Sequence, residues 1–91
     1  MDNILVKMSS AKTENGKILY GGEVYLNNEL VKIIPLLSET KSEIEKLKKY
    51  LNHLRKNLYV RNTSGFKYLI YRDSKGNEME YWNNVPIPFA Y

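Results

Sequence analysis

The sequence predicts an α+β fold, in which a single amphipathic helix packs on an antiparallel β-sheet of about five to six strands, in the order β-β-β-α-β-β-β. A helix-periodic segment with a capping signal begins near residue 40, and segments rich in β-branched and aromatic residues lie on both sides of it. Asparagine and glycine turn signals separate those segments. The 91 residues suit a single domain, placed at 1–82, with an extended apolar C-terminal arm at 83–91.

Three strands are expected before the helix. NILVKM and KILYGGEVYL flank a polar loop in which Asn15-Gly16 favours a turn. Inside the second segment, Gly21-Gly22 predicts a bulge or a close approach of another part of the chain. Asn27-Asn28 suits a two-residue turn, because asparagine tolerates positive φ. Residues 30–34 are interpreted as a third strand that ends at Pro35, although they could also begin a helix.

The helix is predicted from its start signal and its apolar face. Thr40 and Glu43 form a T-x-x-E capping box, in which each side chain satisfies a backbone N–H that the helix leaves unpaired. Apolar residues then recur at spacings of three and four along one face: Ile44, Leu47, Leu51, Leu54 and Leu58. Two heptads are too short for a coiled coil, so this face is expected to pack on the sheet.

Three further strands are expected after the helix, in LYVRN, FKYLIYR and EMEYW. Residues 73–76 suit a type I turn, with Gly76 in the left-handed conformation as a bulge. This turn predicts a register that pairs, on one face, Arg72 with Glu78, Ile70 with Glu80, and Tyr68 with Trp82. On the other face it pairs Tyr71 with Met79 and Leu69 with Tyr81, which makes that face nearly all apolar.

The first of these faces is a candidate binding surface. Its aromatic side chains resemble a stacking platform for bases, but Glu78 and Glu80 share the face and carboxylates repel phosphates. Arg72 is expected to pair with Glu78. A protein partner, or the chain's own C-terminal arm, therefore fits this face better than a nucleic acid. The predicted protein-partner residues are Phe66, Tyr68, Arg72, Glu78, Glu80, Trp82, Phe89 and Tyr91.

The net charge of +4 is concentrated on the helix segment. Residues 38–57 carry six bases and three acids, which leaves +3 there, while residues 1–37 are neutral and the rest contributes +1. Such an excess favours an acidic partner, and Glu45 is placed to pair with Lys49. The candidate residues for nucleic acid or an acidic partner are Lys41, Lys48, Lys49, Arg55 and Lys56. A solvated helix face is the plainer interpretation of the same pattern.

Several function classes find no support in the sequence. There is no cysteine, no carboxylate spacing for metal binding, and no glycine loop for phosphates, so no metal or other cofactor is expected. His53 is the only histidine and falls on the polar face of the helix. No apolar run approaches the length of a membrane span, and the N-terminus lacks signal-peptide features. We therefore expect a soluble cytoplasmic protein that is not an enzyme.

One enzymatic alternative rests on a resemblance. NTSGFKYLIY, followed by a second strand, resembles the central sheet of the RelE family of ribosome-dependent RNase toxins, which work with Lys, Arg and Tyr. Those toxins place two helices before the sheet and basic residues after its last strand. Here three strands precede one helix and the chain finishes in YWNNVPIPFAY, so no residue is carried over.

The C-terminal arm ends in the apolar, proline-stiffened VPIPFAY. An exposed apolar segment usually finds a partner, so the arm is expected to fold back over the aromatic face, exchange with a second copy in a homodimer, or dock into a target.

The sequence as a whole favours a small basic binding protein that acts by protein–protein contact. In size, absence of catalytic groups and mixed-charge aromatic face, the chain resembles the small inhibitors of phages and other mobile elements, among them anti-CRISPR proteins, many of which act on nucleic-acid enzymes. Such a viral inhibitor would act in the host cytoplasm. The alternative is direct nucleic-acid binding through the basic helix face.

Overall fold

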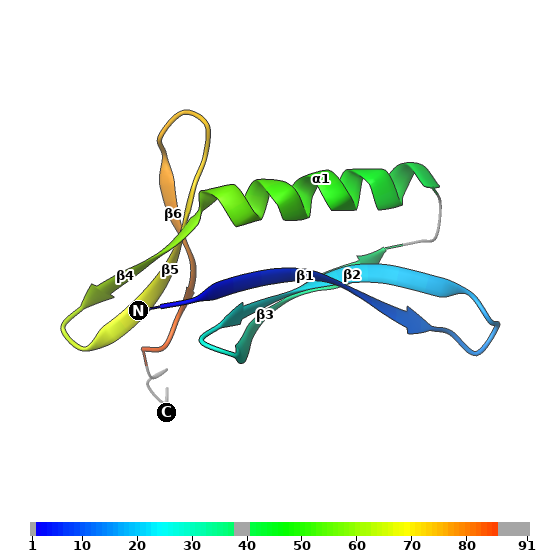
Figure 1. Ribbon diagram of the computed structural model, residues 1–91, viewed down its shortest axis with the longest axis horizontal. Coiled ribbons are helices and arrows are strands. Elements are labelled where there is room, and N and C mark those ends of the chain that lie inside the picture. Colours follow the sequence, from blue (N-terminus) through cyan, green and yellow to red (C-terminus); the bar gives the residue numbers. More distant parts are fainter. Residues whose placement is uncertain (1, 38–40, 86–91) are drawn as a thin grey trace, which may run out of the picture. The chain divides into compact units, whose positions relative to one another are not determined.

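A computed structural model describes residues 2–37 and 41–85. Its elements follow the predicted order β-β-β-α-β-β-β, which confirms the α+β fold class. The six strands are divided between two three-stranded antiparallel sheets, ordered β1-β2-β3 and β4-β5-β6 (Figure 1). The chain separates into two compact units after Lys56. The assignment of residues 1–82 to one domain stays a prediction.

The first sheet consists of β1 (Ile4–Lys12), β2 (Ile18–Leu26) and β3 (Glu29–Leu37). The Asn15-Gly16 turn is confirmed: Gly16 has a φ of 81°, and its N–H donates to the Thr13 carbonyl at 3.0 Å. The Asn27-Asn28 turn is also confirmed, with φ values of 52° and 69°. These positive angles give the primed turn geometry that suits a two-residue hairpin.

Strand β3 settles one alternative and corrects one prediction. Residues 30–34 are strand and not helix, but the strand continues past Pro35 to Leu37, so the predicted end at Pro35 was wrong. β3 lies at the edge of its sheet, and its register against β2 shifts between Tyr20 and Gly22. An edge strand with an irregular ladder tolerates proline, because not every N–H is needed for pairing.

Helix α1 (Lys41–Asn57) packs on the first sheet (Figure 1). Leu47, Leu51 and Leu54 are buried. At Gly22 of β2 a Cβ atom would lie 2.8 Å from Leu51 Cδ2, so the predicted close approach is confirmed. The bulge predicted as its alternative in β2 is not found there: the register does shift beside Gly22, but the extra residue lies in β3, between Ile34 and Leu37. Thr40 of the capping box lies outside the described residues.

The second sheet consists of β4 (Leu58–Thr63), β5 (Phe66–Arg72) and β6 (Glu78–Asn83). Ser64 and Gly65 join β4 to β5 with φ values of 53° and 83°. The predicted turn after Arg72 is confirmed, because Gly76 has a φ of 85° and its N–H donates to the Asp73 carbonyl at 3.1 Å. Both sheets are therefore meanders with tight turns.

The predicted register between β5 and β6 is right near the turn and wrong beyond it. Arg72 pairs with Glu78, Tyr71 with Met79 and Ile70 with Glu80, as expected. The register then shifts by one residue, so that Leu69 pairs with Trp82 and Tyr68 pairs with Asn83. A bulge adds one residue to β6 at this point, and a slip of one residue moves each later side chain to the opposite face.

This shift corrects one expectation about the faces. Trp82 shares a face with Leu69 and not with Tyr68, so it does not belong to the predicted aromatic platform. The other face, predicted to be nearly all apolar, holds Leu69, which is fully buried, and Met79, which is 60% exposed.

The described residues hold no helix that is long and apolar enough to cross a membrane.

Candidate functional site

One face of the second sheet, here called the pocket face, gathers charged and aromatic side chains. The register of β4 against β5 pairs Tyr59 with Ile70 and Arg61 with Tyr68, and the register of β5 against β6 adds the glutamates. Since alternate residues of a strand share a face, the pocket face consists of Tyr59, Arg61, Thr63, Phe66, Tyr68, Ile70, Arg72, Glu78 and Glu80.

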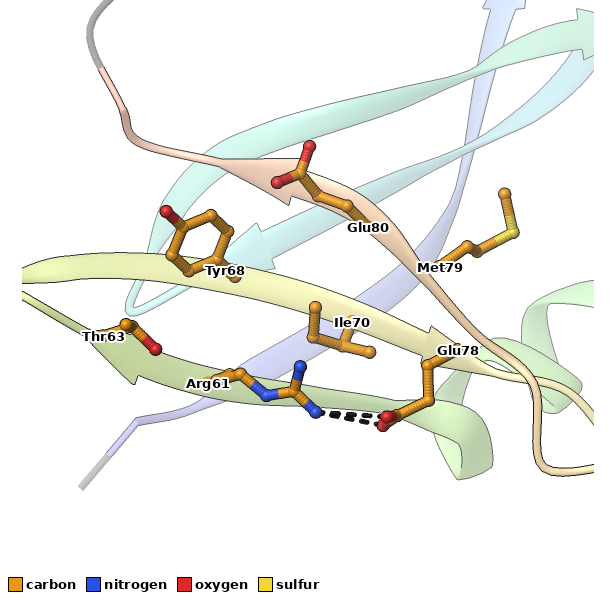
Figure 2. Close-up of a pocket in the computed structure, with 7 residues that line it drawn as sticks. All are labelled: Arg61, Thr63, Tyr68, Ile70, Glu78, Met79 and Glu80. Atoms are coloured by element: carbon orange, nitrogen blue, oxygen red, sulfur yellow. Dashed lines mark hydrogen bonds and ion pairs between the residues drawn. The ribbon is translucent and has the colours of Figure 1, made fainter.

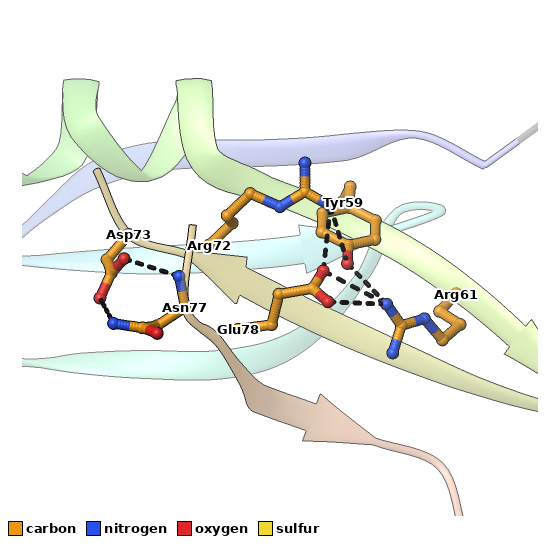
Figure 3. A network of polar contacts seen from close by, with 6 residues as sticks. All are labelled: Tyr59, Arg61, Arg72, Asp73, Asn77 and Glu78. Carbon is orange, nitrogen blue, oxygen red and sulfur yellow. Dashed lines mark hydrogen bonds and ion pairs between the residues drawn. The ribbon is translucent and has the colours of Figure 1, made fainter. Parts of the chain in front are cut away.

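An ion-pair network at one end of the pocket face is centred on Glu78 (Figure 3). Nη2 of Arg61 lies 3.2 Å from both carboxylate oxygens of Glu78, and Nη2 of Arg72 lies 3.1 Å from Oε2. The three side chains come from three different strands, so the network ties β4, β5 and β6 together. The predicted pairing of Arg72 with Glu78 is confirmed.

Tyr59 completes this network. Its hydroxyl accepts a hydrogen bond from Arg61 Nη2 at 2.8 Å, and its ring lies 5.1 Å from the Arg72 guanidinium carbon and 5.7 Å from that of Arg61. Both arginines are therefore within cation–π distance of the same ring. Their charged groups are held by neighbours of the same sheet.

An open pocket of about 380 Å³ lies beside the network (Figure 2). Its volume falls in the range of about 300–1,000 Å³ that ligand pockets occupy. Ile70, which is only 6% exposed, contributes an apolar surface, and Tyr68 contributes a ring. The lining residues are Arg61, Thr63, Tyr68, Ile70, Glu78, Met79 and Glu80.

Glu80 differs from Glu78 in its surroundings. Among the described residues, the Glu80 carboxylate has no salt bridge and no hydrogen bond, whereas Glu78 is bound by two arginines. Glu80 is exposed and lines the pocket from β6. The pocket therefore has a neutralised carboxylate at one position and an unpaired carboxylate at another.

The turn that joins β5 to β6 is stabilised by Asp73 (Figure 3). Oδ1 of Asp73 accepts from the backbone N–H groups of Asn77 and Lys75, each at 2.9 Å, and Oδ2 accepts from the Asn77 side-chain amide at 3.3 Å. The Asn77 N–H is the main reason that the pKa of the Asp73 carboxyl lies below its ordinary value, since these donors favour the charged form. The ionised aspartate thus holds the start of β6 in place.

The structure brings together most of the predicted protein-partner residues. Phe66, Tyr68, Arg72, Glu78 and Glu80 all lie on the pocket face. Trp82 lies on the opposite face, as described above, and Phe89 and Tyr91 lie outside the described residues.

Three members of the pocket face, Tyr59, Arg61 and Thr63, were missed by the sequence analysis. The signal that could have found them is Ser64-Gly65. Read as a two-residue turn, this pair sets the register of β4 against β5 and places Arg61 opposite Tyr68.

The described start of the C-terminal arm is attached to the second sheet. Asn84 N–H donates to the Lys67 carbonyl at 3.2 Å, and the Lys67 N–H donates to Asn84 Oδ1 at 2.7 Å. The remainder of the arm, residues 86–91, lies outside the described residues, so its predicted fold-back or exchange stays a prediction.

The basic helix face is a looser arrangement than the pocket face. Lys41, Lys48, Lys49 and Lys56 are exposed along α1. Glu45 pairs with Lys48 at 3.9 Å, and no pair of Glu45 with the predicted partner Lys49 occurs among the described residues.

Arg55, the fifth candidate on this helix, is already engaged. Its Nε donates to the Val6 carbonyl of β1 at 3.0 Å, and Nη1 donates to Asn52. This guanidinium is therefore less available to phosphates than the four lysines.

No group of three or more His, Cys, Asp or Glu side chains that could hold a metal ion is found in residues 2–37 and 41–85. His53, expected on the polar face of the helix, is half-buried. No family model matches the chain, and no curated protein or solved structure shows significant similarity to it. The geometry of the two surfaces is therefore the basis for any functional assignment.

Proposed function

We propose that the protein is a small non-catalytic inhibitor of the phage or mobile-element type, which acts through protein–protein contact on a nucleic-acid-processing target such as a CRISPR effector. The pocket face would be the contact surface, and the host cytoplasm would be the site of action.

The observation that carries this proposal is the balance of charge on the pocket face. Arg61 and Arg72 share the carboxylate of Glu78, and Glu80 supplies the second negative charge, so the described residues of this face carry no net positive charge to attract phosphates. Glu80 adds an unpaired negative charge to the same face. Aromatic side chains and arginine are enriched in protein interfaces, whereas a phosphate-binding surface presents free cations.

The pocket face also has the stiffness that a recognition surface needs. Three strands support it, the Glu78 network joins them, and the Asp73 turn fixes the start of β6. A surface that is ordered before binding loses less conformational entropy when the complex forms.

Inhibition of target-DNA cleavage by a panel of purified CRISPR effectors tests the proposal. We expect inhibition of at least one effector by the full chain. Tyr68→Ala should weaken it about tenfold or more, as truncation of a central aromatic anchor does. The matched control is Lys48→Glu/Lys49→Glu, which alters the basic helix face and should leave inhibition unchanged. No inhibition of any effector, or a loss confined to the helix variant, would contradict the proposal.

Direct nucleic-acid binding through α1 is the second candidate. The exposed lysines of the helix favour it, because exposed cations along one element are the electrostatic footprint of phosphate contacts. The engagement of Arg55 with Val6 and of Lys48 with Glu45 weakens it. Its test is the salt dependence of binding to labelled DNA and RNA.

A further inference from the structure

The carboxylate of Glu80 is the one acidic group of the pocket face without a cationic partner among the described residues. Glu80 lies opposite Ile70 in the register of β5 and β6, and both line the open pocket (Figure 2). A carboxylate in this position is a ready acceptor for an ammonium or guanidinium group, and such charge-assisted hydrogen bonds are stronger than neutral ones.

The other surfaces of the pocket suit the remainder of a basic side chain. Ile70 supplies apolar surface, on which the methylene stem of lysine or arginine can lie while its charged end reaches a polar group. Tyr68 adds a ring next to the same space, and no contact within the described residues engages its hydroxyl. An aromatic ring attracts a cation placed over its face within about 6 Å of the centroid.

An anion fits the pocket less well than a cation. The described residues that line the pocket carry one positive charge, on Arg61, and two negative charges, on Glu78 and Glu80, and the Nη2 of Arg61 is already bound to Glu78 and to the Tyr59 hydroxyl. An incoming phosphate would approach the unpaired charge of Glu80, and like charges repel. A cation gains the attraction of Glu80, and the repulsion that it meets from Arg61 is offset by the carboxylate of Glu78.

From this arrangement we infer that the pocket binds a lysine or arginine side chain presented by the partner protein. The inference rests on the proposed function and adds the chemistry of the contact: the partner would offer a basic surface residue, of the kind with which nucleic-acid enzymes bind phosphates.

The test is an NMR titration of the ¹⁵N-labelled full chain with a capped Gly-Lys-Gly tripeptide. We expect chemical-shift changes centred on Tyr68, Ile70 and Glu80, with about fivefold weaker binding in Glu80→Gln, which corresponds to the loss of one exposed ion pair. Glu45→Gln, which removes an exposed helix carboxylate, is the matched control and should bind like the parent chain.

Four further probes separate the possible ligands. A Gly-Arg-Gly peptide should bind at the same residues, and the same tripeptide with acetylated lysine should not, because it keeps the stem and loses the charge. Free butylamine should shift the same residues, because it has the methylene stem and the ammonium group of lysine. Equal shifts with the acetylated peptide, shifts centred on α1, or stronger binding of inorganic phosphate at the pocket would overturn the inference.

The Glu80→Gln variant also distinguishes a failure of this inference from a failure of the proposed function. Inhibition that is lost in Tyr68→Ala but unchanged in Glu80→Gln would leave the function standing and overturn the basic-residue contact. Absence of inhibition, together with lysine-peptide binding that Glu80→Gln weakens, would overturn the function and support the pocket.

Discussion

The two sheets of this protein are built alike and carry different surfaces. Each is a three-stranded meander with one two-residue turn and one longer turn that ends in a left-handed glycine, Gly16 in the first sheet and Gly76 in the second. The backbone bonds of the two longer turns also match: Thr13 N–H donates to the Lys17 carbonyl at 2.8 Å, and Asp73 N–H donates to the Asn77 carbonyl at 2.9 Å.

The difference lies in what the side chains of each sheet contact. In the first sheet, Gly22 gives space to Leu51, and the sheet supports the helix through apolar packing. In the second sheet, Glu78 binds Arg61 and Arg72 across three strands and a pocket opens beside them. The two sheets therefore share a backbone plan and differ in the pattern of paired and unpaired charges that their side chains present, and the proposed function depends on that pattern.

The largest expected effect comes from filling the space at Gly22. In Gly22→Val the new side chain would meet Leu51 and Ile34, whose atoms lie 2.8 and 2.9 Å from the position of the added Cβ. Overpacking of this kind costs about 1–3 kcal/mol of unfolding free energy, measurable by denaturant titration. Ala11→Val, at an exposed position of β1, is the control and should change stability little. Equal stability of the two variants would contradict the close packing of α1 on the first sheet.

A smaller effect is expected from removing the centre of the arginine network. Glu78→Ala leaves Arg61 and Arg72 near one another without their shared carboxylate, at a loss of about 1 kcal/mol or less, because the partners are half exposed. The loss should shrink at high salt, since screening weakens both the lost attraction and the new repulsion. Glu45→Ala, which removes the single exposed pair with Lys48, should cost less. A larger loss for Glu45→Ala would show that the network adds nothing to the second sheet.

The smallest expected effect on the free energy of unfolding comes from the two longer turns, and in the second sheet it depends on pH. The Asp73 pKa is lower in the folded chain than in the unfolded chain, where it is about 3.9. The stabilisation is therefore fully present above about pH 4 and is lost as the pH falls through the folded pKa. Acid titration of stability should show this loss in the parent chain and not in Asp73→Asn.

The turn of the first sheet provides the matched control. Thr13 Oγ1 accepts from Lys17 N–H at 3.2 Å and does not titrate, so Thr13→Ala should keep the acid loss of the parent chain. An identical acid profile in Asp73→Asn and the parent would contradict the role given to Asp73.

Local sequence predicted the parts of the fold that depend on local chemistry. The segment FKYLIYR coincides with β5, and asparagine and glycine marked three of the four hairpin turns, because positive φ restricts the residues allowed there. The T-x-x-E signal and the leucine spacing located the helix, although Leu58, counted on its apolar face, is the first residue of β4.

The features that were missed depend on pairing between strands. A bulge inserts one extra residue into β6 and so moves Trp82 away from Tyr68. The alternation of side chains in the sequence of β6 does not reveal this extra residue. The division of six strands between two sheets depends on which edges pair, and local patterns do not determine that choice. In the candidate site, the pairing of Arg72 with Glu78 could be predicted from the turn at residues 73–76 alone. The position of Arg61 could not, because it depends on the register of β4 against β5.

The central claim is that this basic protein binds through the pocket face and not through phosphate contacts of the helix. The most direct measurement is fluorescence anisotropy of labelled duplex DNA, single-stranded DNA and RNA with the full chain, between 50 and 200 mM salt. We predict no specific binding to any of the three, and no difference between the parent and Lys48→Glu/Lys49→Glu. Micromolar binding that falls about 100-fold or more across this salt range and disappears in the helix variant would contradict the claim, and would assign the function to α1.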